Sequence, residues 1–266
     1  MTIQELITGA RKIVFKFGSN TLAGNDGKIN TVLMEEFAGQ AADLSGKGKQ
    51  IVVVSSGAQV AGLSTMDKWA RKKDIHYRQA LCAVGQVRLM ETWGKAFELH
   101  GYRIAQILLT RDDFNDPIRT LNMRNTLFTL VDEGIVPIIN ENDTVSVEEI
   151  KIGDNDTLAA RTAVLWSADL LVLFSDIDGL YDKSPKEFSD AKLIEIVRDI
   201  DLVRKDVSIG AANDFGTGGI ATKLDAAQLA SSYGIPTILA HGGRPHCLKS
   251  LTSGRQNGTV FYTDNN

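Results

Sequence analysis

Short apolar runs alternate with longer amphipathic segments along most of this chain. The runs are rich in β-branched residues and predict strands at Lys12–Phe17, Ile51–Ser55, Arg103–Thr110, Ile135–Ile139, Leu170–Ser175, Thr237–Ala240 and Thr259–Tyr262. Segments with apolar residues three and four positions apart predict helices at Val32–Leu44, Ala80–Leu99, Thr120–Asp132, Thr157–Trp166 and Leu224–Tyr233. Strands that are apolar on both faces and alternate with helices indicate an α/β fold, a three-layer α/β/α sandwich around a mostly parallel sheet.

The length and composition favour one globular domain over residues 1–266 and exclude several classes of protein. With 29 basic and 33 acidic residues the net charge is −4, so nucleic acid and anionic membrane surfaces are poor partners. No stretch reaches the roughly 20 apolar residues of a membrane span, and the first residues lack the order of a signal peptide. We therefore expect a cytoplasmic protein in which Cys82 and Cys247 are reduced thiols.

Polar or glycine-rich clusters follow four of the predicted strands. They are Gly18–Thr21, Ser55–Ala58, Asn140–Asp143 and the pair Ser175 and Asp176. In parallel α/β sheets, ligands bind beyond the carboxyl ends of the strands. The sequence therefore predicts one binding site at this edge of the sheet.

Two distant segments have complementary chemistry for a nucleoside triphosphate. Gly153–Asp156 offers carboxylates, and Thr217–Lys223 offers glycine amides, hydroxyls and an ammonium before a helix that Lys223 is expected to begin. Amides at a helix N-terminus bind phosphate, and a lysine adds a positive charge. Lys16, in an otherwise apolar strand, requires an anionic partner if it is buried. Because Thr222 rather than glycine precedes Lys223, the loop is not a P-loop of the common type.

Simpler structural explanations exist for each of these segments. Asp154–Asp156 also fits an N-terminal cap of the predicted helix Thr157–Trp166, and Lys16 could extend its amine to solvent from a sheet edge. The glycine-rich segment could be a flexible loop, and Asp176–Gly179 a turn. Alternation in Thr144–Ile152 predicts a small hairpin. The histidines lack metal-ligand spacing, and neither a dinucleotide fingerprint nor a nucleophile elbow is present.

At these residues the chain resembles the amino acid kinase family. The resemblance rests on Val14–Ser19, Val54–Ala58, Ala83–Gln86, Leu108–Arg111, Ile139–Asp143, Glu149–Asp156 and Thr217–Lys223. The Asn140–Asp143 and Glu149–Asp156 segments together are similar to the members that phosphorylate the γ-carboxylate of L-glutamate, the first step of proline biosynthesis. Ser55 and Ser175 stand where many relatives have threonine, and both keep the hydroxyl.

The resemblance implies a role for each site residue. It assigns stabilisation of the transferring phosphoryl group to Lys16 and Lys223, held by Asp156, and glutamate binding to Ser56, Asp143 and Asn155. The ATP-binding residues that it implies are Lys16, Ser175, Asp176, Thr217, Gly218, Gly219, Ile220, Ala221, Thr222 and Lys223. Mg²⁺ is expected to be held mainly by the ATP phosphates, with no metal site formed by the protein itself.

The resemblance also implies partners, and it leaves alternative functions open. It implies a homo-oligomer, a dimer or tetramer, a functional link to a γ-glutamyl phosphate reductase, and feedback inhibition by L-proline. Many such members carry a C-terminal PUA domain, which is expected to be absent here because the sequence ends at Asn266. The rivals are family members that phosphorylate aspartate, acetylglutamate, carbamate or uridylate, and a non-catalytic ligand sensor on the same fold.

Overall fold

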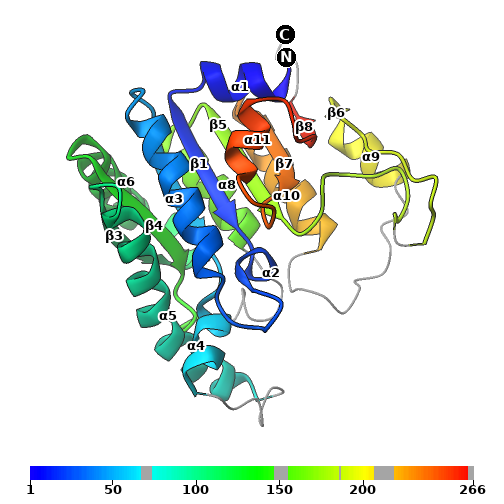
Figure 1. Ribbon diagram of the computed structural model, residues 1–266. Coiled ribbons are helices and arrows are strands. Elements are labelled where there is room, and N and C mark those ends of the chain that lie inside the picture. Colours follow the sequence, from blue (N-terminus) through cyan, green and yellow to red (C-terminus); the bar gives the residue numbers. More distant parts are fainter. Residues whose placement is uncertain (67–73, 147–154, 186, 207–218, 263–266) are drawn as a thin grey trace.

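The computed structural model describes residues 1–66, 74–146, 155–185, 187–206 and 219–262 (Figure 1). The strands are β1 (Lys12–Phe17), β2 (Gln50–Ser55), β3 (Arg103–Leu109), β4 (Ile135–Glu141), β5 (Leu170–Ser175), β6 (Ile196–Val197), β7 (Thr237–His241) and β8 (Thr259–Phe261). The helices are α1 (Ile3–Gly9), α2 (Ser19–Leu22), α3 (Thr31–Ser45), α4 (Ala58–Met66), α5 (Ile75–Glu98), the 3₁₀ helix η1 (Arg111–Phe114), α6 (Pro117–Asp132), α8 (Asn155–Trp166), α9 (Ile200–Asp206), α10 (Ile220–Ser232) and α11 (Cys247–Thr252).

The strands form a single sheet in the order β3-β4-β2-β1-β5-β7-β8-β6. Every pairing from β3 to β7 is parallel, whereas β8 runs antiparallel to β7 and parallel to β6. The carboxyl ends of β4, β2, β1 and β5 therefore lie in a row at one edge of the sheet. The predicted α/β class with a mostly parallel central sheet is confirmed.

Helices cover both faces of the sheet, and each face has its own hydrophobic core (Figure 1). One core joins the sheet to α1, α3, α5 and α11, and includes the rings of Phe15, Phe17, Phe37 and Trp93. Within it the indole Nε1 of Trp93 donates a hydrogen bond of 2.9 Å to Ser55 Oγ. The other core joins the sheet to α6, α8 and α10. Burial on both faces explains why the strands read as continuous apolar runs.

Side-chain alternation along β1 decides which face receives Lys16. Phe15 and Phe17 belong to the core under α3 and α5, whereas Val14 belongs to the core under α8 and α10. Because successive side chains of a strand point to opposite faces, Lys16 lies on the same face as Val14. The ammonium group therefore faces α8 and α10, not the aromatic cluster.

Helices α4 and α5 approach each other closely at two glycines. A Cβ atom placed on Gly85 would lie 1.8 Å from the carbonyl oxygen of Ala58, and one placed on Gly62 would lie 2.1 Å from that of Leu81. No side chain fits at such distances. The two glycines fix how α4 sits on α5, whose first turn is capped by the Asp74 carboxylate.

Several predicted boundaries are wrong in informative ways. Asn140 and Glu141 lie within β4 instead of following it. The helix expected to begin at Lys223 begins at Ile220, and the helix expected at Thr157 begins at Asn155. The two-residue strand β6 and the short helices α1, α2, α4, η1, α9 and α11 were not predicted, because a short segment carries too little periodicity.

The predicted hairpin at Thr144–Ile152 is tested only at its start. Thr144 lies in a turn and residues up to Ser146 belong to no strand, while residues 147–152 lie outside the described residues. Within the part of the chain that the structure describes, no helix is long and apolar enough to cross a membrane. Both cysteines are buried free thiols.

Candidate active site

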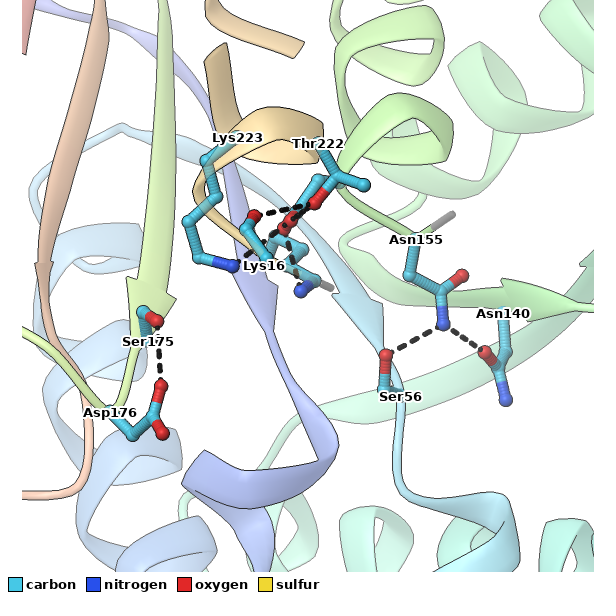
Figure 2. Close-up of polar contacts among 10 residues, drawn as sticks. Lys16, Ser56, Asn140, Asn155, Ser175, Asp176, Thr222 and Lys223 are labelled. Carbon is cyan, nitrogen blue, oxygen red and sulfur yellow. Dashed lines mark hydrogen bonds and ion pairs between the residues drawn. The ribbon is translucent and has the colours of Figure 1, made fainter. Parts of the chain in front are cut away.

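A buried carboxylate joins two buried lysines at the carboxyl edge of the sheet. The Nζ atom of Lys16, on β1, lies 2.7 Å from Asp156 Oδ1, and the Nζ atom of Lys223, on α10, lies 3.2 Å from Asp156 Oδ2. Asp156, in the first turn of α8, is fully buried, and the two lysines are 4% and 6% exposed. Figure 2 shows both ammonium groups turned toward the same point.

The lysines keep this carboxylate ionised. Burial by itself raises the pKa of Asp156, but the charges of Lys16 and Lys223 outweigh it and lower the pKa to about 2. The Thr222 hydroxyl lies 2.9 Å from Asp156 Oδ2 and gives further support. The three charged side chains form a fixed unit with two positive charges and one negative charge.

The N-termini of α8 and α10 bring these residues together. Asp156 occupies the first turn of α8, and Lys223 the first turn of α10, whose N-cap is Gly219. The N-cap residue is a glycine and has no side chain that could accept from the first backbone amides of the helix. Helix N-termini attract anions, and here two of them lie beside two ammonium groups. The arrangement is suited to phosphate groups.

A second polar group lies beside the lysines and consists of Ser56, Asn155 and Asn140. Nδ2 of Asn155 donates hydrogen bonds to Ser56 Oγ at 2.7 Å and to Asn140 Oδ1 at 2.9 Å (Figure 2). All three side chains are at most 2% exposed. They come from three elements: Ser56 follows β2, Asn140 lies in β4, and Asn155 begins α8.

The end of β4 and the residues after it add two buried acidic groups to this part of the edge. Asp143, two residues past the end of β4, is 6% exposed. Its backbone carbonyl accepts a hydrogen bond of 3.1 Å from Gln79 on α5. Glu141, at the end of β4, accepts a hydrogen bond of 2.6 Å from the Ser146 hydroxyl. Carboxylates and amide oxygens suit a ligand that carries an ammonium group.

Ser175 and Asp176 lie on the opposite side of the lysines from Asn155 (Figure 2). The Ser175 hydroxyl donates to Asp176 Oδ1 at 3.1 Å, and Asn20 of α2 lies 3.4 Å from the other oxygen of Asp176. The strand order β4-β2-β1-β5 gives the same sequence of groups along the edge. The two lysines therefore stand between the Ser56–Asn155–Asn140 group and the Ser175–Asp176 pair.

The sequence profile of the amino acid kinase family matches residues 11–241, most of the chain. The chain belongs to the amino acid kinase family. It is 58% identical over 259 residues to a glutamate 5-kinase of Alkaliphilus metalliredigens, a match that covers 97% of this chain and 98% of the relative. A glutamate 5-kinase of Alkaliphilus oremlandii is 56% identical over 262 residues, covering 98% of this chain and all of the relative.

The amino acid kinase fold is also evident among solved structures. UMP kinase from Ureaplasma parvum superposes with a TM-score of 0.65 at 15% sequence identity, covering 95% of this chain and 99% of that structure. At this identity the likeness concerns the fold alone. It agrees with the single sheet and the two helical layers described above.

The structure brings most of the predicted site residues of this amino acid kinase to one edge. Lys16, Asp156 and Lys223 are in direct contact, as are Ser56 and Asn155. Asp156, in a segment that also fits a helix N-terminus, lies in the first turn of α8, and its carboxylate binds Lys16 and Lys223. Thr217 and Gly218, like Gly153 and Asp154, lie outside the described residues.

Sequence reasoning gave no individual role to Asn140 or to two glutamines of α5. Gln86 accepts a hydrogen bond of 2.9 Å from Asn140 Nδ2, and Gln79 binds the Asp143 carbonyl. The helix predicted at Ala80–Leu99 omitted Gln79, which lies in α5 seven residues before Gln86. Residues separated by about two helical turns share a face, so both can reach the same neighbour.

Proposed function

We propose that this protein transfers the γ-phosphoryl group of ATP to the γ-carboxylate of L-glutamate, giving γ-glutamyl phosphate and ADP as the first step of proline biosynthesis. The observation that carries this proposal is the buried unit of Lys16, Asp156 and Lys223, located between two polar groups. The high identity to two glutamate 5-kinases over nearly the whole chain supports the choice of glutamate.

The phosphate side of the site would be formed by the lysines and the start of α10. In this proposal, Lys16 and Lys223 contact oxygens of the transferring group and neutralise the charge that develops on them. Asp156 does not touch the phosphate but fixes the two ammonium groups. ATP would bind to Ser175, Asp176 and the residues from Thr217 to Lys223, namely Thr217, Gly218, Gly219, Ile220, Ala221, Thr222 and Lys223.

The acceptor side would be formed by Ser56, Asn155 and Asp143. Ser56, whose hydroxyl oxygen accepts from Asn155, would lie against a carboxylate of glutamate. The Asp143 carboxylate and the carbonyl oxygen of Asn155 would accept from the α-ammonium group. Because β2 and β4 lie to one side of β1, glutamate would approach the lysines from the side opposite to ATP.

The transfer requires no general base. The γ-carboxylate of glutamate is ionised near pH 7, and one of its oxygens attacks the γ-phosphorus as the bond to the β,γ-bridging oxygen breaks. The electron pair leaves with ADP. This chemistry needs positioning and positive charge, which suits a site built from lysine, aspartate and amide side chains.

The proposed reaction also uses a divalent cation, which phosphate oxygens bind. Among the residues that the structure describes, no three His, Cys, Asp or Glu side chains are grouped as a metal site would need. We propose that Mg²⁺ enters with ATP and is held mainly by phosphate oxygens, whose charge it neutralises.

A panel of phosphoryl acceptors tests which substrate the protein phosphorylates. The assay traps acyl phosphates with hydroxylamine in the presence of ATP and Mg²⁺, with L-glutamate, L-aspartate, N-acetyl-L-glutamate or carbamate, while ADP formation is followed with UMP. Product with glutamate alone is the expected result. Product with another acceptor would assign the chain to a different branch of the family, and binding of ATP and glutamate without product would indicate a sensor.

A matched pair of lysine variants tests the lysine role. Lys12 and Lys16 lie on the same strand and the same face, but Lys12 is at the amino end, where its Nζ contacts the Phe128 and Trp166 rings. K16M should lower kcat by at least 100-fold, whereas K12M should retain most of the activity. Comparable activity of folded K16M and K12M would remove the basis for the proposed mechanism.

Three further features belong to the proposal. The product is a labile acyl phosphate, so a reductase that consumes it is the expected functional partner. Inhibition by L-proline is tested by adding it to the glutamate assay, and a homo-oligomer, dimer or tetramer, by light scattering of the purified protein.

A further inference from the structure

Helix α5 presents two glutamines to the residues that end β4. Gln79 and Gln86 are seven positions apart, about two helical turns, and therefore lie on one face of the helix. Gln86 Oε1 accepts a hydrogen bond of 2.9 Å from Asn140, and Gln79 Nε2 donates one of 3.1 Å to the carbonyl of Asp143. Neither glutamine is assigned a role in the reaction proposed above.

A backbone amide fixes the direction of the hydrogen bonds that run from Gln86 to Ser56. The Glu141 N–H can only donate, and it lies 2.9 Å from Asn140 Oδ1. That atom is therefore the amide oxygen, so the Asn155 atom at 2.9 Å from it must be a nitrogen. The Asn140 amide nitrogen consequently faces Gln86, which must offer its oxygen.

The orientation of Asn155 determines which ligand groups this part of the site can bind. Its amide nitrogen uses both hydrogens on Asn140 and Ser56, so its carbonyl oxygen faces away from them. Ser56 accepts one of these two hydrogen bonds through its hydroxyl oxygen. The Asn155 oxygen, held in this direction, can accept a hydrogen bond from a ligand that carries an ammonium group. If the Asn155 amide were reversed, an N–H donor would stand where this acceptor lies.

Gln86 supplies the hydrogen-bond acceptor for the Asn140 amide nitrogen. Asn140 is 1% exposed, and its amide nitrogen needs an acceptor because water cannot replace Gln86 at low cost. Without that acceptor, Asn140 would leave a buried donor unsatisfied or move away from Asn155. Gln79 acts on the same segment by a different contact, since it holds the backbone of Asp143.

We propose that Gln86 and Gln79 are positioning residues for the amino-acid acceptor: Gln86 sets the amide orientation of Asn140 and Asn155, and Gln79 places Asp143. This inference rests on the proposed function, because it concerns the acceptor side of that same site. The two glutamines do not touch the lysines or the Ser175–Asp176 pair in any contact described above. Loss of either glutamine should therefore raise KM for glutamate and leave KM for ATP nearly unchanged.

The test compares Q86M and Q79M with the control Q40M. Methionine keeps the length of glutamine and removes the hydrogen-bonding atoms. Gln40 is also half-buried and hydrogen-bonded, to Glu36 and Lys249 at the α3–α11 contact, and touches no residue assigned to the pocket. Q86M should raise KM for glutamate about tenfold, the effect of losing one buried hydrogen bond, with KM for ATP within about twofold. Q79M should raise it about threefold.

The same substitution in a second variant, S56A, distinguishes a positioning role of Gln86 from a packing role. In S56A the last hydrogen bond of the network is absent, so adding Q86M should raise KM for glutamate by clearly less than tenfold. Equal KM values for Q86M and wild type, or a parallel rise for both substrates, would overturn the inference. So would full additivity with S56A. If the wild type does not phosphorylate glutamate, the proposed function itself fails, and calorimetric titration of each variant with glutamate then tests the positioning role.

Discussion

The substitution D156N isolates the charge that holds the two lysines. Asparagine has nearly the same shape as aspartate, but it carries no negative charge between Nζ atoms that lie 2.7 and 3.2 Å from the carboxylate oxygens. Asp156 is fully buried, so solvent cannot take over its role. The variant should therefore be less stable as well as less active.

The size of the effect follows from the pKa and from burial. A pKa lowered from 3.8 to about 2 means that the folded protein favours the carboxylate by about 2–3 kcal/mol. Removing one partner of a buried ion pair typically costs about 3–5 kcal/mol, since a charge is left buried without its counter-ion. We expect D156N to lower the free energy of unfolding by at least ~3 kcal/mol, and kcat by about 100-fold or more.

The same pKa gives the pH dependence its sign. Because the pKa of Asp156 is lower in the folded state, its stabilising contribution is present above about pH 4. This contribution is lost as pH falls toward 2, where the folded carboxyl group is protonated. The stability difference between wild type and D156N should therefore be constant from pH 5 to 7 and shrink between pH 4 and 2.

Urea unfolding followed by circular dichroism measures the stability, and hydroxamate formation measures kcat. D169N is the matched control, since Asp169 is an exposed carboxylate that accepts from the Arg11 and Lys12 amides at the amino end of the same sheet. It should keep its kcat. In the double variant D156N/K223M one of the two ammonium groups is also removed, so this protein should be more stable than D156N yet inactive.

Unfolding of D156N at the same urea concentration as the wild type would show that the Asp156 charge does not stabilise the fold. A folded D156N that keeps more than a third of the wild-type kcat would show that the lysines are positioned without the carboxylate. Equal stability of D156N and D156N/K223M would show that the ammonium group of Lys223 is not destabilising when the carboxylate is absent.

Further predictions concern packing and thiol reactivity. G85A should destabilise the protein by about 3 kcal/mol or more in urea unfolding, because its Cβ would overlap the Ala58 carbonyl. G94A on the same helix is the control: the nearest atom to its Cβ would be 3.9 Å away, so this variant should be neutral or stabilising. S55A should cost about 1–3 kcal/mol by leaving the Trp93 indole N–H without its acceptor, and the tryptophan emission should shift. Burial raises the pKa of Cys247 to about 12, so a disulfide-exchange reagent at pH 8 should label this thiol only after unfolding. Labelling in the native state would show that its environment is open.

The sequence alone determined the layers and the edge at which the site lies. Apolar runs such as Leu170–Ser175 are buried on both faces, so their composition identifies them as central parallel strands. Polar groups directly after those strands then have to meet at the carboxyl edge. Amphipathic helices such as α3 were evident for a similar reason, since a repeat of 3.6 residues is a local property.

Only the tertiary structure decided which side chains touch. Asp156 and Lys223 are 67 positions apart, and Asn155 and Ser56 are 99 apart, so their contacts depend on the strand order and on the packing of α8 against α10. The direction of each amide was equally hidden, because it is set by the Glu141 backbone N–H and by Gln86 on another helix. Local pattern fixes the period of an element and therefore its buried face, whereas side-chain partners depend on long-range packing that no short segment encodes.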